Sequence, residues 1–244
     1  METKQLVVRA VDVGYGHVKW SEGRDAEGAI VADVFPSQVV MASEGEFRSE
    51  IMQARDTIRV PVNGRMFEVG RGLRMAVGRS AELEHLDAKF ALSDGYAARL
   101  FGAFNYMLDT LPTRTIDYLM LGLPLTTFNK NSNELFTKFL GDHTINQKGD
   151  VLRVENCAVY PQPLGAYAAY LETPLERHTS PPMALIVDIG YNTVDWLTCE
   201  GMVANPGQSS AVQRGMSGFL REVAKSVIKN TGFEANESAV VRIL

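Results

Sequence analysis

The chain has 244 residues with 45% hydrophobic content and a formal net charge of −5. This length allows one large or two modest domains with a substantial core. The negative charge provides no basic surface, so we expect no direct nucleic-acid binding. No apolar run reaches the roughly 18 residues that a membrane-spanning helix requires, and the charged start is unlike a secretory signal, so we expect a cytoplasmic protein with no membrane partner. Cys157 and Cys199 lack metal-ligand spacing and are expected to be buried, reduced thiols.

Segment 7–20 combines an apolar run, a carboxylate, a glycine-spaced turn and a second short run. Gly14 and Gly16 permit positive φ and let backbone N–H groups approach a ligand closely. A carboxylate at the end of a buried strand, here Asp12, is costly unless it meets a metal, water or a donor. Lys19 can supply positive charge to phosphate oxygens. The segment therefore predicts a hairpin whose turn lies against an anion.

The next part of the chain predicts strands and a second hairpin. A strand is expected within 29–40, broken at Phe35-Pro36-Ser37, and 44–56 is expected to be a loop or short helix. Alternating residues over 57–70 flank Asn63-Gly64, which favours a hairpin with a type I′ turn. Residues 70–92 give no assignment.

The middle of the chain predicts two helices and two strands. Ser93 and Asp94 can cap a helix over 95–111, which Pro112 ends. The apolar run 116–123 is typical of a buried central strand, and 151–160 of another. Between them, Ser132 can cap a helix that carries four apolar residues, Leu135, Phe136, Phe139 and Leu140.

The last third begins with Pro161-Gln162-Pro163 and a helix over 164–171. Residues 179–182 are expected to be a linker, and 183–187 to open a second domain. Ser217 and Gly218 precede an amphipathic helix over 219–229, with one apolar face formed by Phe219, Val223 and Val227. The apolar end at 239–244 leads us to expect a shortened product.

Segment 184–196 repeats the pattern of the first hairpin. Asp188-Ile189-Gly190-Tyr191 has the order of Asp12-Val13-Gly14-Tyr15, again between two apolar runs. A duplicated strand, carboxylate and glycine turn suggests two like domains that face each other across a cleft. Each would offer a phosphate-binding turn to one nucleotide.

These two motifs resemble the phosphate 1 and phosphate 2 motifs of the superfamily of actins, sugar kinases and heat-shock-chaperone ATPases. Asp12-x-Gly14-x-Gly16-x-x-Lys19 has the actin spacing. Within the superfamily the chain looks most like the ParM/StbA plasmid-segregation actins, in the branch called PRTRC system protein D. The resemblance extends to about residue 230, with further matches at Phe35-Pro36-Ser37, Leu121-Gly122-Leu123-Pro124-Leu125, Tyr160-Pro161-Gln162-Pro163-Leu164-Gly165-Ala166 and Gly215-Met216-Ser217-Gly218.

The resemblance implies an α/β, actin-like ATPase (ribonuclease H-like) fold, with two similar domains around a nucleotide cleft. The first domain would cover 1–178, with a small insertion subdomain at about 30–92, and 183–244 would begin the second. The longer second domain of the family, with its adenosine motif, is not matched, so we expect an incomplete second domain.

The implied ligand is ATP with Mg²⁺. Asp12 and Asp188 would hold the metal through water, because Mg²⁺ dehydrates reluctantly. Gln162, where actin has Gln and ParM has Glu, would orient the attacking water as a third catalytic residue. The expected nucleotide-binding residues are Asp12, Gly14, Tyr15, Gly16, His17, Lys19, Asp188, Gly190, Tyr191, Asn192, Thr193, Gly215 and Ser217.

Each of these residues also has a structural interpretation. Asp12 could simply cap a turn, Gln162 could belong to a rigid bend between prolines, and Lys19 could be solvated. Tyr15, His17 and Tyr191 more often pack around such turns than react. Asp195 could be structural or catalytic.

The implied function is an ATPase of low turnover that assembles head-to-tail filaments for plasmid DNA segregation. Its partners would be further copies of itself and an adaptor protein bound to plasmid centromere DNA. Two alternatives stay open: a nucleotide-binding interaction module that does not polymerise, and a small-molecule kinase of the same superfamily. A kinase would need a catalytic Asp, for which Asp195 is a candidate.

Overall fold

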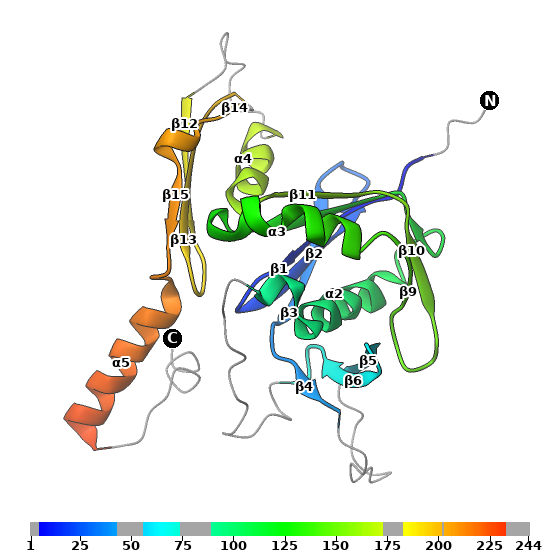
Figure 1. Cartoon of the computed structure of the whole chain (residues 1–244), viewed down its shortest axis with the longest axis horizontal. Coiled ribbons are helices and arrows are strands. Elements are labelled where there is room, and N and C mark those ends of the chain that lie inside the picture. Colours follow the sequence, from blue (N-terminus) through cyan, green and yellow to red (C-terminus); the bar gives the residue numbers. More distant parts are fainter. Residues whose placement is uncertain (1–4, 43–55, 74–88, 173–182, 202, 233–244) are drawn as a thin grey trace. The chain divides into compact units, whose positions relative to one another are not determined.

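The structure is a computed structural model that describes residues 5–42, 56–73, 89–172, 183–201 and 203–232 (Figure 1). It divides into two compact units. Unit 1 comprises 1–123 and 127–160, and unit 2 comprises 124–126 and 161–244. The functional domains expected at 1–178 and 183–244 stay a prediction. The linker expected at 179–182, the apolar end at 239–244 and all but the last residue of the loop or helix expected at 44–56 lie outside the described residues.

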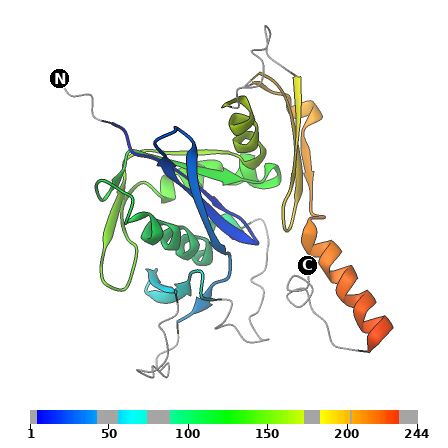
Figure 2. The ribbon, with the colours of Figure 1, turned by 180° about the vertical axis from the view of Figure 1, so that it is seen from behind.

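Unit 1 is built on a five-stranded sheet that holds the first hairpin (Figure 2). Its order is β11 (Cys157–Pro161), β8 (Tyr118–Leu123), β1 (Val8–Val13), β2 (His17–Arg24) and β3 (Ile30–Pro36). Strands β1, β2 and β3 are antiparallel neighbours, and β8 runs parallel to β1. The predicted hairpin at 7–20 and the strand that ends near Phe35 are confirmed.

Two three-stranded sheets contain the other strands in the described part of unit 1. One has the order β7 (Thr115–Ile116), β10 (Val151–Val154), β9 (Gly141–Thr144), and the other β4 (Val40–Met41), β6 (Arg65–Val69), β5 (Ile58–Val62). Asn63 and Gly64 join β5 to β6 with φ of 49° and 74°. Both values are positive, as a type I′ turn requires, so the predicted hairpin is confirmed.

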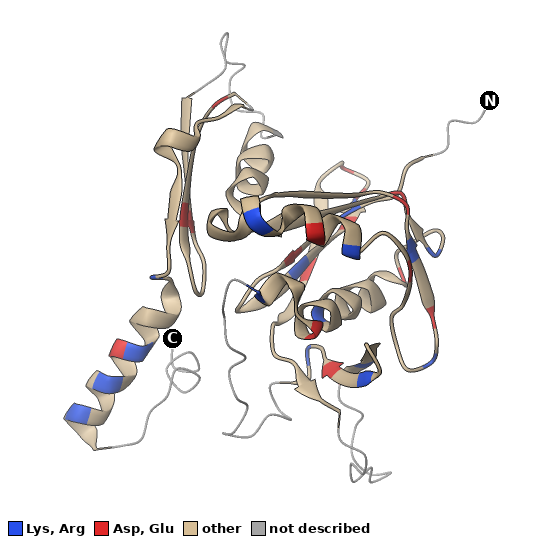
Figure 3. Ribbon diagram, viewed as in Figure 1, with Lys and Arg blue, Asp and Glu red and all other residues tan. Residues whose placement is uncertain are grey.

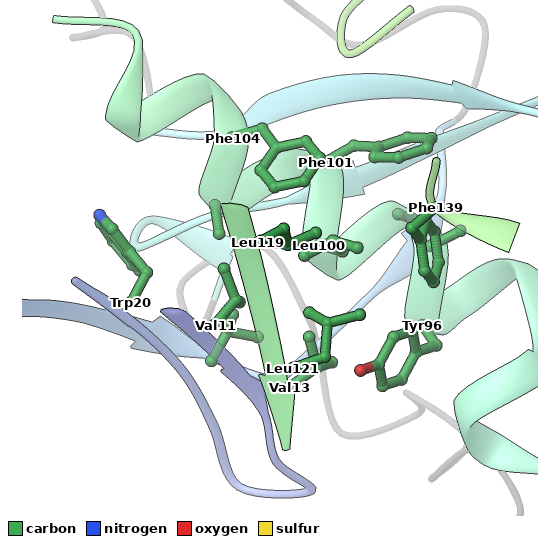
Figure 4. Close-up of a cluster of buried hydrophobic side chains, with 14 of the residues drawn as sticks. Val11, Val13, Trp20, Tyr96, Leu100, Phe101, Phe104, Leu119, Leu121 and Phe139 are labelled. Atoms are coloured by element: carbon green, nitrogen blue, oxygen red, sulfur yellow. The ribbon is translucent and has the colours of Figure 1, made fainter. Parts of the chain in front are cut away.

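The core of unit 1 lies where the helix α2 (Asp94–Met107) contacts β1, β2, β5 and β6 (Figure 4). The short helix η1 (Phe90–Leu92) precedes α2, and α3 (Leu125–Lys138) follows β8. Ser93 Oγ accepts a hydrogen bond from the backbone N–H of Tyr96 at 3.0 Å, which confirms Ser93 as the N-cap. The buried side chains include Val11, Val13, Trp20, Tyr96, Leu100, Phe101, Phe104, Leu119, Leu121 and Phe139.

The described part of unit 2 contains an antiparallel sheet, the helices α4 (Gln162–Glu172) and α5 (Met216–Thr231), and the short helix η2 (Pro206–Gln208). The strand β13 (Val194–Glu200) pairs with β12 (Met183–Ile189), β14 (Val203–Ala204) and β15 (Ser210–Val212). The helix α4 packs against β12 and β13, and η2 and α5 follow β14 and β15. Cys157 of unit 1 and Cys199 of unit 2 are both buried, free thiols, as expected.

The strand expected at 116–123 is confirmed over Tyr118–Leu123, as β8, but Ile116 belongs to β7 of another sheet because the chain changes sheets at Asp117. Its carboxylate accepts the Val7 N–H at 2.8 Å, and its own N–H donates to the Val7 carbonyl at 2.9 Å. Tyr118 and Met120 on β8 are exposed, so this strand is buried on one face only in the structure. The run at 151–160 is likewise divided into β10 and β11, which belong to different sheets.

Four helix boundaries also differ from the predictions. Ser132 lies within α3, which begins at Leu125, and α4 begins at Gln162 instead of 164. The helix α2 ends at Met107 instead of 111. The helix α5 begins at Met216, and Phe219 is exposed while Leu220 and Ala224 are buried. No helix in the described ranges is long and apolar enough to cross a membrane.

Candidate functional site

The turn between β1 and β2 is closed by one backbone hydrogen bond. The N–H of Gly14 donates to the carbonyl of His17 at 3.1 Å. A Cβ on Gly14 would lie 2.9 Å from that same carbonyl oxygen, closer than side chains approach in practice. Residue 14 must therefore be glycine for the chain to turn this tightly.

The turn between β12 and β13 has the same construction. The N–H of Gly190 donates to the carbonyl of Thr193 at 2.9 Å, and a Cβ on Gly190 would lie 3.1 Å from that oxygen. Each turn thus spans four residues with a glycine at its first position, where a Cβ would be closely approached by the carbonyl at the fourth. The repeat that the sequence suggests is present in the local geometry of both units.

Asp12 and Lys19 face each other across the first hairpin. They are paired in the β1–β2 register, and Lys19 Nζ lies 3.7 Å from Asp12 Oδ2. Their side chains stay 36% and 65% exposed, respectively. An exposed pair of this kind contributes little to stability, so a phosphate group can compete with Asp12 for the Lys19 ammonium.

The second hairpin carries two carboxylates at the equivalent register, Asp188 and Asp195. Asp195 is buried, and its Oδ1 accepts the N–H of Leu125 at the start of α3 at 2.7 Å. Burial raises the pKa of the Asp195 carboxyl, and the charge of Asp188 adds to this, whereas the bonds from Thr193 and Leu125 oppose it. Asp195 therefore serves as the cap of α3, which favours its structural interpretation over that of a catalytic base.

The carbonyl groups of the second turn are held by the start of α5. The N–H groups of Gly215, Met216 and Ser217 donate to the carbonyls of Asn192 at 3.0 Å, Gly190 at 3.0 Å and Tyr191 at 2.7 Å. A Cβ on Gly215 would lie 2.6 Å from the oxygens of Gly190 and Tyr191. Gly215 and Ser217, expected as nucleotide-binding residues, are thus placed by the structure behind the turn as its backbone support.

Four further candidates occupy ordinary structural positions. Tyr15 packs on Phe90 with ring centroids 4.6 Å apart, and Tyr191 packs against the buried cluster of α5, as the structural interpretation expects. Thr193 is buried and bonded to Asp195. Gln162 is the first residue of α4, so the rigid bend between Pro161 and Pro163 is instead a helix start.

Sequence reasoning missed a direct contact to the first turn from Ser37. Its hydroxyl donates to the Gly14 carbonyl at 2.5 Å and its N–H to the Gly16 carbonyl at 2.9 Å. Ser37 lies directly after β3 and 23 positions from Gly14, so no local pattern indicates this contact, and only the match of Phe35-Pro36-Ser37 to a family pattern drew attention to it. Among the described residues, no group of three or more His, Cys, Asp or Glu is placed to hold a metal.

Residues 10–165 match the family described as "Actin like proteins N terminal domain". The chain is an actin-like protein. Residues 186–244 of this actin-like protein also match "Archaeal actin homologue MreB-like, C-terminal". Comparison with curated proteins gives no match.

Solved structures give the same fold. An archaeal actin homologue, Ta0583, in complex with ADP is 20% identical, with a TM-score of 0.68 over 97% of this chain and 70% of that one. A ParM filament from Clostridium botulinum is 17% identical, with a TM-score of 0.70 over 98% of this chain and 74% of that one. The AlfA filament from B. subtilis plasmid pLS32 is 18% identical, with a TM-score of 0.63 over 93% and 79%. The chain therefore has the actin-like ATPase fold and spans about three quarters of these relatives.

Proposed function

We propose that this actin-like protein binds ATP through its two glycine turns and hydrolyses it slowly. The supporting observation is that Gly14 and Gly190 close two turns of the same construction. Each glycine lies two residues after a carboxylate near the end of a strand. Both turns would contact the phosphates of one nucleotide. Lys19, on the strand after the first turn, would add a positive charge, and Asn192 would add an amide donor.

Asp12 and Asp188 would hold Mg²⁺ through water. Hard oxygen ligands suit this ion, which usually keeps several waters and needs only one or two carboxylates from the protein. The two residues fit that requirement, because Asp12 is partly exposed beside its turn and Asp188 occupies the same position before the second. Bound there, Mg²⁺ would neutralise charge on the phosphates.

Gln162 would orient the attacking water. An amide cannot take a proton at neutral pH, so it can position water by hydrogen bonds without acting as a base. Its place at the start of α4 gives its side chain a fixed origin on a helix that packs against β12 and β13. Low turnover follows from the lack of a general base in this role.

We further propose that ATP binding drives head-to-tail assembly in the manner of ParM/StbA proteins, in the branch called PRTRC system protein D. A heterologous self-contact that does not close produces an open filament. Two solved relatives are filaments, one of ParM and one of AlfA bound to AMPPNP. Plasmid DNA would be reached through an adaptor protein at the centromere, because the chain has a net charge of −5 and acidic as well as basic residues are present in both units (Figure 3).

The experiment is sedimentation of the purified protein with Mg²⁺ and ATP, ADP or AMPPNP, beside a binding measurement with each nucleotide. Two variants remove one negative charge from the same hairpin with little change of shape. Asp188→Asn alters the proposed magnesium residue, on β12 near the turn. Glu200→Gln alters the end of the hairpin far from the turn, on β13 across from Met183.

Pelleting with ATP and AMPPNP that is lost in Asp188→Asn and retained in Glu200→Gln would support the proposal. Nucleotide binding without pelleting would overturn filament assembly by this chain and leave the interaction module. Phosphate transfer to an added small molecule, in place of release to water, would favour the kinase. Loss of binding in both variants alike would refute the role of Asp188.

A further inference from the structure

Ser37 contacts the first turn with two hydrogen bonds from a single buried residue. It lies in the connection between β3 and β4. Its hydroxyl donates to the Gly14 carbonyl at 2.5 Å, and its backbone N–H donates to the Gly16 carbonyl at 2.9 Å. Only 4% of Ser37 is exposed, so water does not compete for these bonds. Two of the turn's carbonyl groups are therefore directed toward Ser37.

Ser37 is itself held from the helix α2. Arg99 Nε donates to the Ser37 carbonyl at 2.7 Å, and Arg99 is also buried. The Arg99 guanidinium lies 5.1 Å from the centroid of the Phe90 ring, and that ring packs on Tyr15. Arg99 on α2 is thus connected to the turn in two ways, through Ser37 and through the packed rings of Phe90 and Tyr15.

We infer that Ser37 is a positioning residue for phosphate binding by the first turn, an inference that rests on the proposed function. Glycine-spaced turns have many accessible conformations, and some of them would direct a carbonyl oxygen toward a phosphate and repel it. Two bonds from Ser37 keep the carbonyls of Gly14 and Gly16 turned away from that position. The turn then meets a phosphate with its N–H groups already oriented, so that binding does not have to order it.

The test compares Ser37→Ala with Ser21→Ala by the dissociation constant for MgATP. Ser21 is on β2 of the same hairpin, and its Oγ accepts the Ala10 N–H at 2.8 Å, away from the turn. Both variants thus lose one side-chain hydrogen bond of the hairpin, but only Ser37→Ala frees a turn carbonyl. We expect Ser37→Ala to bind MgATP about threefold to tenfold more weakly, the range that one net hydrogen bond supports. Ser21→Ala should bind as the wild type does.

The melting temperature without nucleotide is measured in parallel, and a purely structural role would lower it without changing the affinity of the folded protein.

Equal MgATP affinity in Ser37→Ala and the wild type would overturn the positioning role and leave the proposed function intact. An equal loss in Ser37→Ala and Ser21→Ala would also overturn it, since the effect would then follow hairpin stability. A wild type that does not bind MgATP would overturn the proposed function, and this inference with it.

Discussion

Replacing Gly215 with Ala should destabilise unit 2 and displace the second turn. The backbone at Gly215 has φ of −78° and ψ of −169°, which alanine adopts freely, so the effect comes from space alone. The added Cβ would lie 2.6 Å from two carbonyl oxygens and 2.7 Å from the Asn192 carbonyl carbon, and these backbone atoms must move. Overpacking costs roughly 1–3 kcal/mol and weakened hydrogen bonds about 1 kcal/mol more, so we expect a loss of about 2–4 kcal/mol.

Gly218→Ala is the matched control for this change. No atom lies within 4 Å of the Cβ that it would add, and the residue is within α5, where alanine is favoured over glycine by roughly 0.5–1 kcal/mol. The same substitution three positions apart should therefore have opposite signs. The assay is guanidinium chloride unfolding in a Trp20→Phe background, where fluorescence of Trp196 on β13 reports on unit 2. Equal stability of the two variants would refute the reasoning.

Three further predictions follow from single contacts. Ser93→Ala removes the cap of α2 and should cost about 1 kcal/mol of unfolding free energy in denaturant titration, while Ser93→Asp should retain most of it. Lys19→Met should change stability by less than about 1 kcal/mol, because its pair with Asp12 is exposed, yet weaken MgATP binding in calorimetry. Burial raises the pKa of the Asp195 carboxyl above 3.8, so the stability that the protonated group contributes is lost as pH rises from 3.8 through the raised pKa. Asp195→Asn does not titrate, so its unfolding free energy relative to the wild type should increase over that pH range in denaturant titrations.

The two turns could be predicted from the sequence because each is a local structure. A Cβ on Gly14 or Gly190 would lie 2.9 or 3.1 Å from a carbonyl oxygen only three residues further along the chain, and apolar residues precede and follow each turn. The hairpin at Asn63-Gly64 and the cap of α2 at Ser93 were predicted for the same reason. In each case the residues that decide the structure are within a few positions of one another.

Structure that depends on distant residues was not predicted. The start of α3 at Leu125 has its cap in Asp195, seventy positions later, so local reasoning selected Ser132 instead. The division of 116–123 depends on the bonds between Asp117 and Val7, which are 110 positions apart. A pattern of apolar residues indicates which side chains are buried, but not which strand lies beside them. The break at Asp117 depends on its hydrogen bonds to Val7, and so on the neighbouring segment.

The carbonyl groups of the two turns are held by different means. In unit 1 one side chain and one N–H of Ser37 bind the carbonyls of Gly14 and Gly16, whereas in unit 2 three successive N–H groups at the start of α5 bind those of the second turn. The pattern of a carboxylate followed by a glycine turn is repeated in the sequence, but the residues that bind the turn carbonyls are not. A requirement that the carbonyls be turned away explains why Gly215 must lack a Cβ and why Ser37 must carry a donor. On this argument, variants of either support should weaken phosphate binding, although neither residue would contact the phosphate with its side chain.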